Sequence, residues 1–248
     1  MPNQEVNKFV ILAMPRTGST LLTTTLNTHP DIACHGEIFR RNIKKIQGPV
    51  KILNKVDSEF QDEDYRIDNP FALLDNICRL EEKSTCIGFK LMLVQHPSLM
   101  ENIIKDKTDF KIIFLKRDNV LSVYSSDRIA QATGQNIAGK KSNIKTAKVK
   151  FEATSFEEFL DKYESKYQHT KQLLESVNRE HLELEYNDLR SPQGFEEVLR
   201  FLKVNEEVMR TPTKKRNSDS ILERFTNPKV VRDYLKSKDL QKWITEKQ

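Results

Sequence analysis

Residues 9–22 (FVILAMPRTGSTLL) place a buried apolar run, a tight turn and the start of a helix one after another. At such a junction the first N–H groups of the helix have no partner within it, and the positive end of the helix dipole points at the turn. Both effects stabilise an anion in the turn. Arg16 adds a cation, Gly18 lets the backbone approach closely, and Ser19 and Thr20 add hydroxyl groups. The stretch predicts a phosphate-type site.

This turn differs from the loop that binds nucleoside triphosphates, whose pattern is Gly-x-x-x-x-Gly-Lys-Ser/Thr. Ala13 and Ser19 stand where that pattern has its first glycine and its lysine. The missing lysine would contact the β- and γ-phosphates, and a cation stands in the turn itself instead, as Arg16. The turn therefore predicts a 5′-diphosphate-like group that is bound without a metal ion.

A second stretch, residues 114–125 (FLKRDNVLSVYS), has a similar arrangement. The expected strand ends at the cation Arg117, and a helix starts two or three residues later. Ser125 lies eight residues after this arginine, and Ser122 lies one helical turn before Ser125 on a similar face. An arginine and a helix hydroxyl can hold one phosphate from two directions, each charge-assisted bond contributing roughly 1.5–3 kcal/mol.

The elements around these junctions follow a regular alternation. Apolar runs typical of strands buried on both faces lie at residues 9–14, 86–93, 111–115 and 181–186. Helical patterns lie at residues 20–26, 97–104, 119–132, 155–177, 191–202 and 228–240, with Ser155 and Glu158 spaced as a capping box. This alternation predicts an α/β fold with a central parallel β-sheet flanked by helices.

Two stretches, residues 40–85 and 133–155, lack a clear pattern over much of their length. We interpret them as irregular segments on the acceptor side or in a lid. No internal repeat or interdomain linker is evident, so we expect residues 1–248 to form one domain with its core at about residues 8–225.

The composition narrows the class of protein. The net charge of +5 favours anionic ligands without demanding nucleic acid. Three cysteines without metal-type spacing disfavour both a disulfide scaffold and a zinc cluster. No apolar run approaches the ~18–20 residues that a membrane span requires. We expect a soluble, cytoplasmic protein.

Taken together, residues 15–22 and 114–125 resemble the two nucleotide-binding motifs of sulfotransferases that use 3′-phosphoadenosine 5′-phosphosulfate (PAPS). The resemblance implies a P-loop-containing nucleotide-hydrolase-like fold, PAPS as co-substrate, adenosine 3′,5′-bisphosphate (PAP) as product, and no metal requirement. The donor-binding residues that it implies in these two motifs are Arg16, Thr17, Gly18, Ser19, Thr20, Leu21, Arg117 and Ser125.

Further segments are similar to the same family. Residues 185–189 (EYNDL) resemble a strand end that contributes Tyr186, and residues 213–218 (TKKRNS) resemble a basic loop that closes over the 3′-phosphate through Lys215 and Arg216. Residues 87–92 and 126–134 look like the bacterial trehalose-type branch. That branch suggests a saccharide acceptor, although another small molecule stays open.

The family resemblance also indicates catalytic residues. Arg16 would stabilise the leaving group, with Lys90 as a weaker second cation. Glu37 matches the position of a general base, for which a carboxyl with an ordinary pKa near 4.3 would need a pKa raised by burial. His35 is the alternative base, although its side chain would point to the opposite face of an extended segment.

Other function classes stay open at this point. The main alternative is a nucleotide or small-molecule kinase with a degenerate phosphate loop. A nucleotide- or RNA-binding module could use the basic residues 139–150 and 214–216, but few aromatic residues accompany them to stack on bases. We expect no nucleic-acid partner, and a homodimer is one assembly that stays open.

Overall fold

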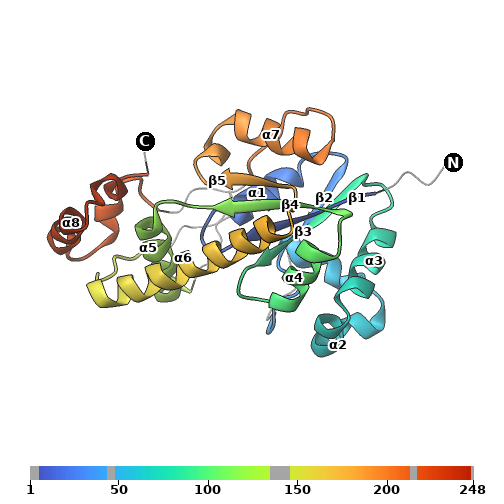
Figure 1. The fold of residues 1–248 in the computed structure, drawn as a ribbon, viewed down its shortest axis with the longest axis horizontal. Coiled ribbons are helices and arrows are strands. Elements are labelled where there is room, and N and C mark those ends of the chain that lie inside the picture. Colours follow the sequence, from blue (N-terminus) through green and yellow to red (C-terminus); the bar gives the residue numbers. More distant parts are fainter. Residues whose placement is uncertain (1–5, 44–47, 135–145, 213–216, 247–248) are drawn as a thin grey trace.

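The computed structural model of the protein describes residues 6–43, 48–134, 146–212 and 217–246 (Figure 1). Within these ranges one sheet holds five parallel strands in the order β2-β3-β1-β4-β5. The strands are β1 (Asn7–Ala13), β2 (Ile32–His35), β3 (Cys86–Met92), β4 (Phe110–Lys116) and β5 (His181–Glu185). The predicted α/β fold with a central parallel sheet is confirmed.

The central strand β1 shows why these apolar runs form strands. Val10 and Leu12 point into one apolar cluster, whereas Phe9 and Ile11 point into another, and all four side chains are fully buried. A strand that is covered on both faces is apolar at nearly every position. The continuous apolar run of residues 9–14 is therefore explained by burial between two helical layers.

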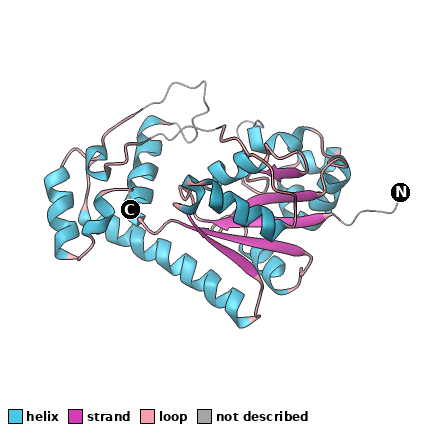
Figure 2. Ribbon diagram, turned by 90° about the horizontal axis from the view of Figure 1, so that it is seen from above, coloured by secondary structure: helices cyan, strands magenta, loops and turns pink. Residues whose placement is uncertain are grey.

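Helices cover both faces of the sheet (Figures 1 and 2). On one face α1 (Ser19–Leu26) and α7 (Pro192–Leu202) contribute to the cluster around Ile11. The other face is covered by α3 (Pro70–Leu80), α4 (Pro97–Lys105), α5 (Val120–Thr133) and α6 (Ala153–Ser176). The apolar core on this face continues past residue 225 into α8 (Pro228–Ser237) and Trp243.

The expected capping box at the start of α6 is wrong. The helix begins two residues earlier, at Ala153, with Glu152 as its N-cap. The hydroxyl of Ser155 instead accepts a hydrogen bond of 2.9 Å from Arg128 of α5. A tertiary contact therefore uses the side chain that local spacing had assigned to the helix end.

The interpretation of residues 40–85 as irregular is also wrong in large part. This segment holds α2 (Glu63–Asp68), α3 and two short 3-10 helices, Gly48–Asn54 and Ser58–Gln61. Short helices show too few turns for their periodicity to stand out among polar residues, yet Phe60 and Ile67 are buried. Of the second irregular stretch, residues 135–145 lie outside the described residues.

The carboxyl ends of the strands bring the predicted sites together. Ala13 pairs with Met92 of β3 and with Leu115 of β4, so the segments that follow β1, β3 and β4 leave the sheet at one edge. After β1 the chain continues to β2 at one edge of the sheet. After β3 it crosses past β1 to β4, toward the opposite edge. In open parallel sheets such a reversal of direction leaves a crevice in which ligands bind.

Two tyrosines of α6 fix the strand ends at this edge. The hydroxyl of Tyr167 accepts from the N–H of Met14 at 3.2 Å and donates to the carbonyl of Leu115 at 2.6 Å. One turn earlier, the hydroxyl of Tyr163 accepts from the N–H of Arg117 and donates to its carbonyl. Burial raises the pKa of Tyr167 to about 12, so its hydroxyl keeps the proton that it donates.

Replacing Tyr167 by Phe leaves the N–H of Met14 and the carbonyl of Leu115 buried without this partner. Because each unsatisfied buried group costs about 1–3 kcal/mol and two groups lose this partner, we expect the free energy of unfolding to fall by about 2 kcal/mol or more. Urea unfolding followed by circular dichroism measures this loss. Tyr65→Phe, at an exposed tyrosine, is the matched control. Equal stability of the two variants would show that the hydroxyl of Tyr167 does not stabilise the strand ends.

Candidate active site

The predicted phosphate loop is built as a tight turn closed from within. Thr17 is fully buried and donates from Oγ1 to the carbonyl of Met14 at 2.8 Å. Gly18 is the N-cap of α1 with φ of +93°, in the left-handed region. A Cβ at Gly18 would lie 2.6 Å from the ring of Tyr186, so only glycine fits. The loop therefore presents the first N–H groups of α1 to the crevice.

The first turn of α1 supplies the polar lining of this loop. Ser19 is buried and Thr20 is half-buried. The N–H groups of the first helical turn have no intrahelical acceptor and stay available to an anion. Leu21 has a different place, because it packs against the apolar cluster on the α1 face.

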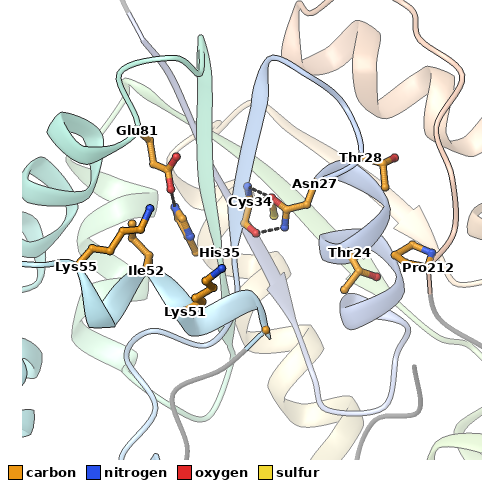
Figure 3. A pocket seen from close by; sticks show the side chains of 11 residues that line it. Thr24, Asn27, Thr28, Cys34, His35, Lys51, Ile52, Lys55, Glu81 and Pro212 are labelled. Carbon is orange, nitrogen blue, oxygen red and sulfur yellow. Dashed lines mark hydrogen bonds and ion pairs between the residues drawn. The ribbon is translucent and has the colours of Figure 1, made fainter. Parts of the chain in front are cut away.

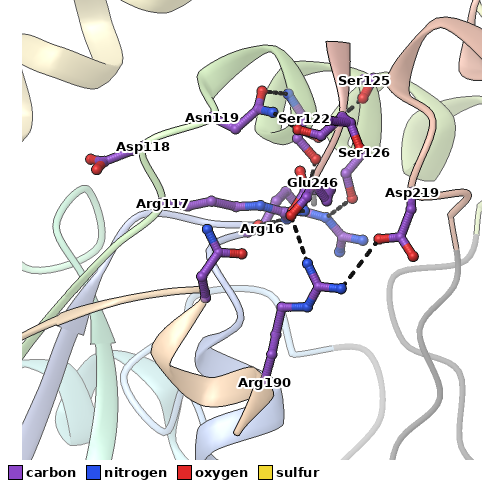
Figure 4. Close-up of polar contacts among 12 residues, drawn as sticks. Arg16, Arg117, Asp118, Asn119, Ser122, Ser125, Ser126, Arg190, Asp219 and Glu246 are labelled. Atoms are coloured by element: carbon purple, nitrogen blue, oxygen red, sulfur yellow. Dashed lines mark hydrogen bonds and ion pairs between the residues drawn. The ribbon is translucent and has the colours of Figure 1, made fainter. Parts of the chain in front are cut away.

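The second predicted anion site centres on Arg117, whose guanidinium is almost fully buried (Figure 4). Its Nη2 donates to Ser122 Oγ at 2.7 Å and forms an ion pair of 2.9 Å with Glu246 Oε2. The ring of Tyr186 lies beneath it, 4.0 Å from the guanidinium carbon to the ring centroid. The structure thus brings Tyr186 into contact with both anion sites.

Arg224 is a third arginine at this site, and the sequence motifs did not indicate it as a site residue. It is buried and donates from Nη1 to Ser122 Oγ at 2.8 Å and to Ser125 Oγ at 3.1 Å. Burial and the neighbouring Arg117 lower the pKa of Arg224 to about 10. Ser122 Oγ therefore accepts from both Arg117 and Arg224 and links them into one cationic group, and Ser125 contacts Arg224 alone of the two. The only signal in the sequence was an arginine close to the apolar residues Ile221, Leu222 and Phe225.

Arg16 and Arg117 belong to one cluster. Arg117 Nη1 donates to the carbonyl oxygen of Arg16 at 2.8 Å. Arg16 Nε in turn donates to Ser126 Oγ at 3.1 Å, on the helix that carries Ser122 and Ser125. Two stretches about 100 residues apart in sequence therefore present their cations to the same edge of the sheet.

A buried lysine links the phosphate loop to the predicted base. Lys90 Nζ donates to Thr20 Oγ1 at 3.1 Å and forms an ion pair of 3.0 Å with Glu37 Oε1. The other carboxylate oxygen, Glu37 Oε2, accepts from Gln95 Nε2 at 2.5 Å. Lys90 is thus a cation between the loop and the carboxylate, with both of its contacts inside the site.

Glu37 does not have the raised pKa that an effective general base would need. Burial of the carboxyl group acts to raise the pKa, but the charge of Lys90 and the hydrogen bonds from Lys90 and Gln95 outweigh it, so the pKa lies below its ordinary value. Glu37 is therefore ionised throughout the neutral range. It can accept a hydrogen bond from a hydroxyl group at any physiological pH.

His35 lies in a different place. Its ring lines a cavity of about 510 Å³ together with Asn27, Lys51 and Lys55, and its Nε2 lies 3.7 Å from Glu81 Oε1 (Figure 3). Neither Glu37 nor Lys90 lines this cavity. Burial lowers the pKa of His35 to about 4. The structure therefore does not bring His35 to the cluster of cations and leaves its ring neutral at neutral pH.

The remaining predicted binding residues, Lys215 and Arg216, lie outside the described residues. The neighbouring Ser218 is described, and its carbonyl accepts hydrogen bonds from Arg224. The site thus combines an anion-binding loop, a second group of arginines and a lysine–carboxylate pair at the crevice edge of a parallel sheet. This arrangement defines the molecule as a P-loop-like α/β protein.

Comparison with known proteins narrows the class further. Residues 8–207 match the Sulfotransferase family. Because this match covers most of the chain, the protein belongs to the sulfotransferase family, as its motifs predict. A stretch of 134 residues is 30% identical to nodulation protein H of Rhizobium tropici, covering 51% of this chain and 47% of that protein. The chain therefore spans about half the length of this curated relative.

Solved structures share the fold. The chain is similar to a sulfotransferase from Alicyclobacillus acidocaldarius, with a TM-score of 0.51 and 17% identity over 96% of this chain and 98% of that chain. The sulfotransferase domain from the Curacin biosynthetic pathway gives a TM-score of 0.50 and 17% identity over 82% of this chain and 75% of that domain.

Among the described residues, no helix has the length and apolar character needed to cross a membrane.

The neutral His35 makes the stability of the fold depend on pH. Its pKa is about 4 when folded and about 6.5 when unfolded, so between these values the unfolded chain binds a proton that the folded chain does not. Acidification from pH 6.5 to 4 should therefore lower the free energy of unfolding of the wild type by up to about 3 kcal/mol more than that of His35→Gln.

Urea unfolding at several pH values measures this difference. His169→Gln, at an exposed histidine of α6, is the control and should keep the wild-type dependence on pH. If His35→Gln also kept it, the ring of His35 would not be held neutral by the fold.

Proposed function

We propose that the protein is a sulfotransferase that moves a sulfuryl group from PAPS to a hydroxyl group of a saccharide or another small molecule. The observation that carries the proposal is the hydrogen bond from Arg117 to the main chain of Arg16. It places two cationic sites side by side, which suits a nucleoside that carries an anionic group at each of two positions.

The residues present fit such a donor. The loop around Gly18 offers backbone N–H groups and Arg16 to the 5′-phosphosulfate. Arg117 and Arg224, joined by Ser122, offer charge-assisted hydrogen bonds to the 3′-phosphate, with Ser125 beside Arg224. The two buried guanidinium groups share Ser122 and carry two positive charges, of which the carboxylate of Glu246 balances one, so a further anion is favoured because burying unbalanced charge is costly. Lys215 and Arg216 are proposed to join them.

Lys90 adds a second cation beside the loop that holds Arg16. A lysine in the loop itself would replace Ser19, but here the ammonium group reaches Thr20 from β3. We propose that Lys90 and Arg16 stabilise the negative charge that builds on the bridging oxygen as the sulfur–oxygen bond of the donor breaks. These two cations take the role that metal ions have in many phosphoryl-transfer sites.

Glu37 is the proposed proton acceptor. The acceptor hydroxyl would donate its hydrogen to the carboxylate while its oxygen forms the new bond to sulfur, and the electron pair of the breaking bond stays on the phosphate of PAP. Since the pKa of Glu37 is lowered, the proton moves only as the new bond makes the hydroxyl strongly acidic. Lys90 would hold this carboxylate close to the donor loop.

The segment of residues 40–85 is proposed to form the acceptor side. Arg66 of α2 is buried and donates from Nε to the carbonyl of Ile38, the residue after Glu37. This contact ties α2 to the backbone that carries the proposed base. We keep the trehalose-type branch, a homodimer and a cytoplasmic location as predictions for experiment.

Arg117→Ala should weaken the binding of PAP by about tenfold or more, because one charge-assisted pair contributes roughly 1.5–3 kcal/mol. Isothermal titration calorimetry measures the affinity, and thermal unfolding checks that the variant is folded. Arg79→Ala, at an exposed arginine of α3, is the control. Unchanged affinity in Arg117→Ala would remove this residue from the donor site.

Glu37→Gln should lower the turnover number by about 100-fold or more, since the amide cannot take up the proton. The affinity for PAP should stay within about twofold, because Glu37 lies at the acceptor end. A screen of acceptors with sulfur-labelled PAPS measures turnover, with Mg-ATP as the donor in a parallel reaction to test for a kinase. If Glu37→Gln kept its rate and His35→Gln lost it, the base would be His35.

A further inference from the structure

The carboxylate of Glu246 lies inside the group of arginines. Its side chain is almost fully buried, and Oε2 pairs with Arg117 Nη2 at 2.9 Å (Figure 4). Its negative charge also acts on the guanidinium of Arg224. A buried carboxylate in contact with one guanidinium and close to a second makes the kind of contact that an anionic ligand would make with these arginines.

The fit of this carboxylate is incomplete. Within the part of the chain that the structure describes, Glu246 Oε1 and Arg117 Nε are both buried without a hydrogen-bond partner. One carboxylate also balances only one of the two guanidinium charges. A phosphate has three terminal oxygens and about −1.5 to −2 charges, so it can satisfy donors that the carboxylate leaves unpaired.

The backbone around Glu246 holds the side chain in place. We call residues 243–246 the Glu246 strap. Thr245 forms an antiparallel bridge with Ser220, and the N–H of Glu246 donates to the carbonyl of Asp219 at 3.0 Å. Arg190 donates from Nη1 to the carbonyl of Glu246 at 2.6 Å.

The strap is also joined to the helix that carries the anion site. The side chain of Asn119, the N-cap of α5, donates to the carbonyls of Trp243 and Thr245 and accepts from the N–H of Ser122. Movement of the strap therefore directly changes the surroundings of the helix end at which Arg117 and Ser122 meet.

Resting on the proposed function, we propose that Glu246 is an internal competitor of the donor: its carboxylate occupies the 3′-phosphate site, and PAPS or PAP binds there only when the strap has left. In the occupied state the carboxylate balances the charge of Arg117 while the nucleotide is absent. The free energy needed to move the strap away lowers the apparent affinity for any ligand with a 3′-phosphate. A nucleotide without a 3′-phosphate has no need to displace the strap.

The test compares PAP with adenosine 5′-monophosphate (AMP), which lacks the 3′-phosphate. Glu246→Gln keeps the size of the side chain and removes its charge, so it should bind PAP about tenfold or more tightly than the wild type. Its affinity for AMP should stay within about twofold. Glu164→Gln, at an exposed glutamate of α6, is the control for a change in net charge. Calorimetry measures all affinities.

Trp243 provides a second readout, since it is the single tryptophan of the sequence and lies buried in the strap. Saturating PAP should shift the fluorescence of the wild type to longer wavelength as the strap leaves, whereas AMP should not. Unchanged emission with bound PAP would show that the strap stays in place and would overturn the proposal.

The outcomes separate this proposal from the proposed function. If neither the wild type nor Glu246→Gln bound PAP, the donor site itself would be wrong. If both bound PAP with equal affinity, the donor site would stand and the competition would be refuted. Equal tightening for PAP and AMP in Glu246→Gln would also refute it, because the effect would then be one of general charge.

Discussion

The burial of Arg117 is the constraint on which the site depends. A guanidinium that is removed from water must be surrounded by acceptors and balanced by an anion. The chain supplies acceptors from the carbonyl of Arg16, from Ser122 and from Glu246. These contacts come from three distant parts of the sequence, so one buried charge draws the phosphate loop, the start of α5 and the strap to the same point.

Hydrogen bonds from two tyrosines of α6 hold these segments together. Tyr167 bonds the backbone after β1 to that at the end of β4, and Tyr163 holds the backbone of Arg117 itself. The strands fix the spacing of the two anion sites through their register, and the tyrosines fix the direction in which the chain leaves them. Preorganised charge of this kind stabilises a transferring group without reorganisation during the reaction.

What the sequence could predict was local. A buried strand, a turn and a helix start are recorded in consecutive residues, so the phosphate loop and the Arg117 motif were recognisable. Arg224 lies 102 residues after Ser122, to which it donates, and Lys90 lies 70 residues after Thr20. Neither contact leaves a mark in spacing. The direction in which the pKa of Glu37 is shifted could not be predicted for the same reason, because its partner Lys90 lies on β3, far away in the sequence.

The two carboxylates of the site differ in a way that their exposure explains. Glu37 pairs with Lys90 but keeps 25% of its side chain exposed, whereas the side chain of Glu246 is 1% exposed beside Arg117. A carboxylate that is open to the crevice can meet an incoming hydroxyl without leaving its partner. One that is enclosed by the anion site can only be replaced. In the proposed reaction, the same kind of ion pair would therefore support transfer at the acceptor end and oppose donor binding at the other.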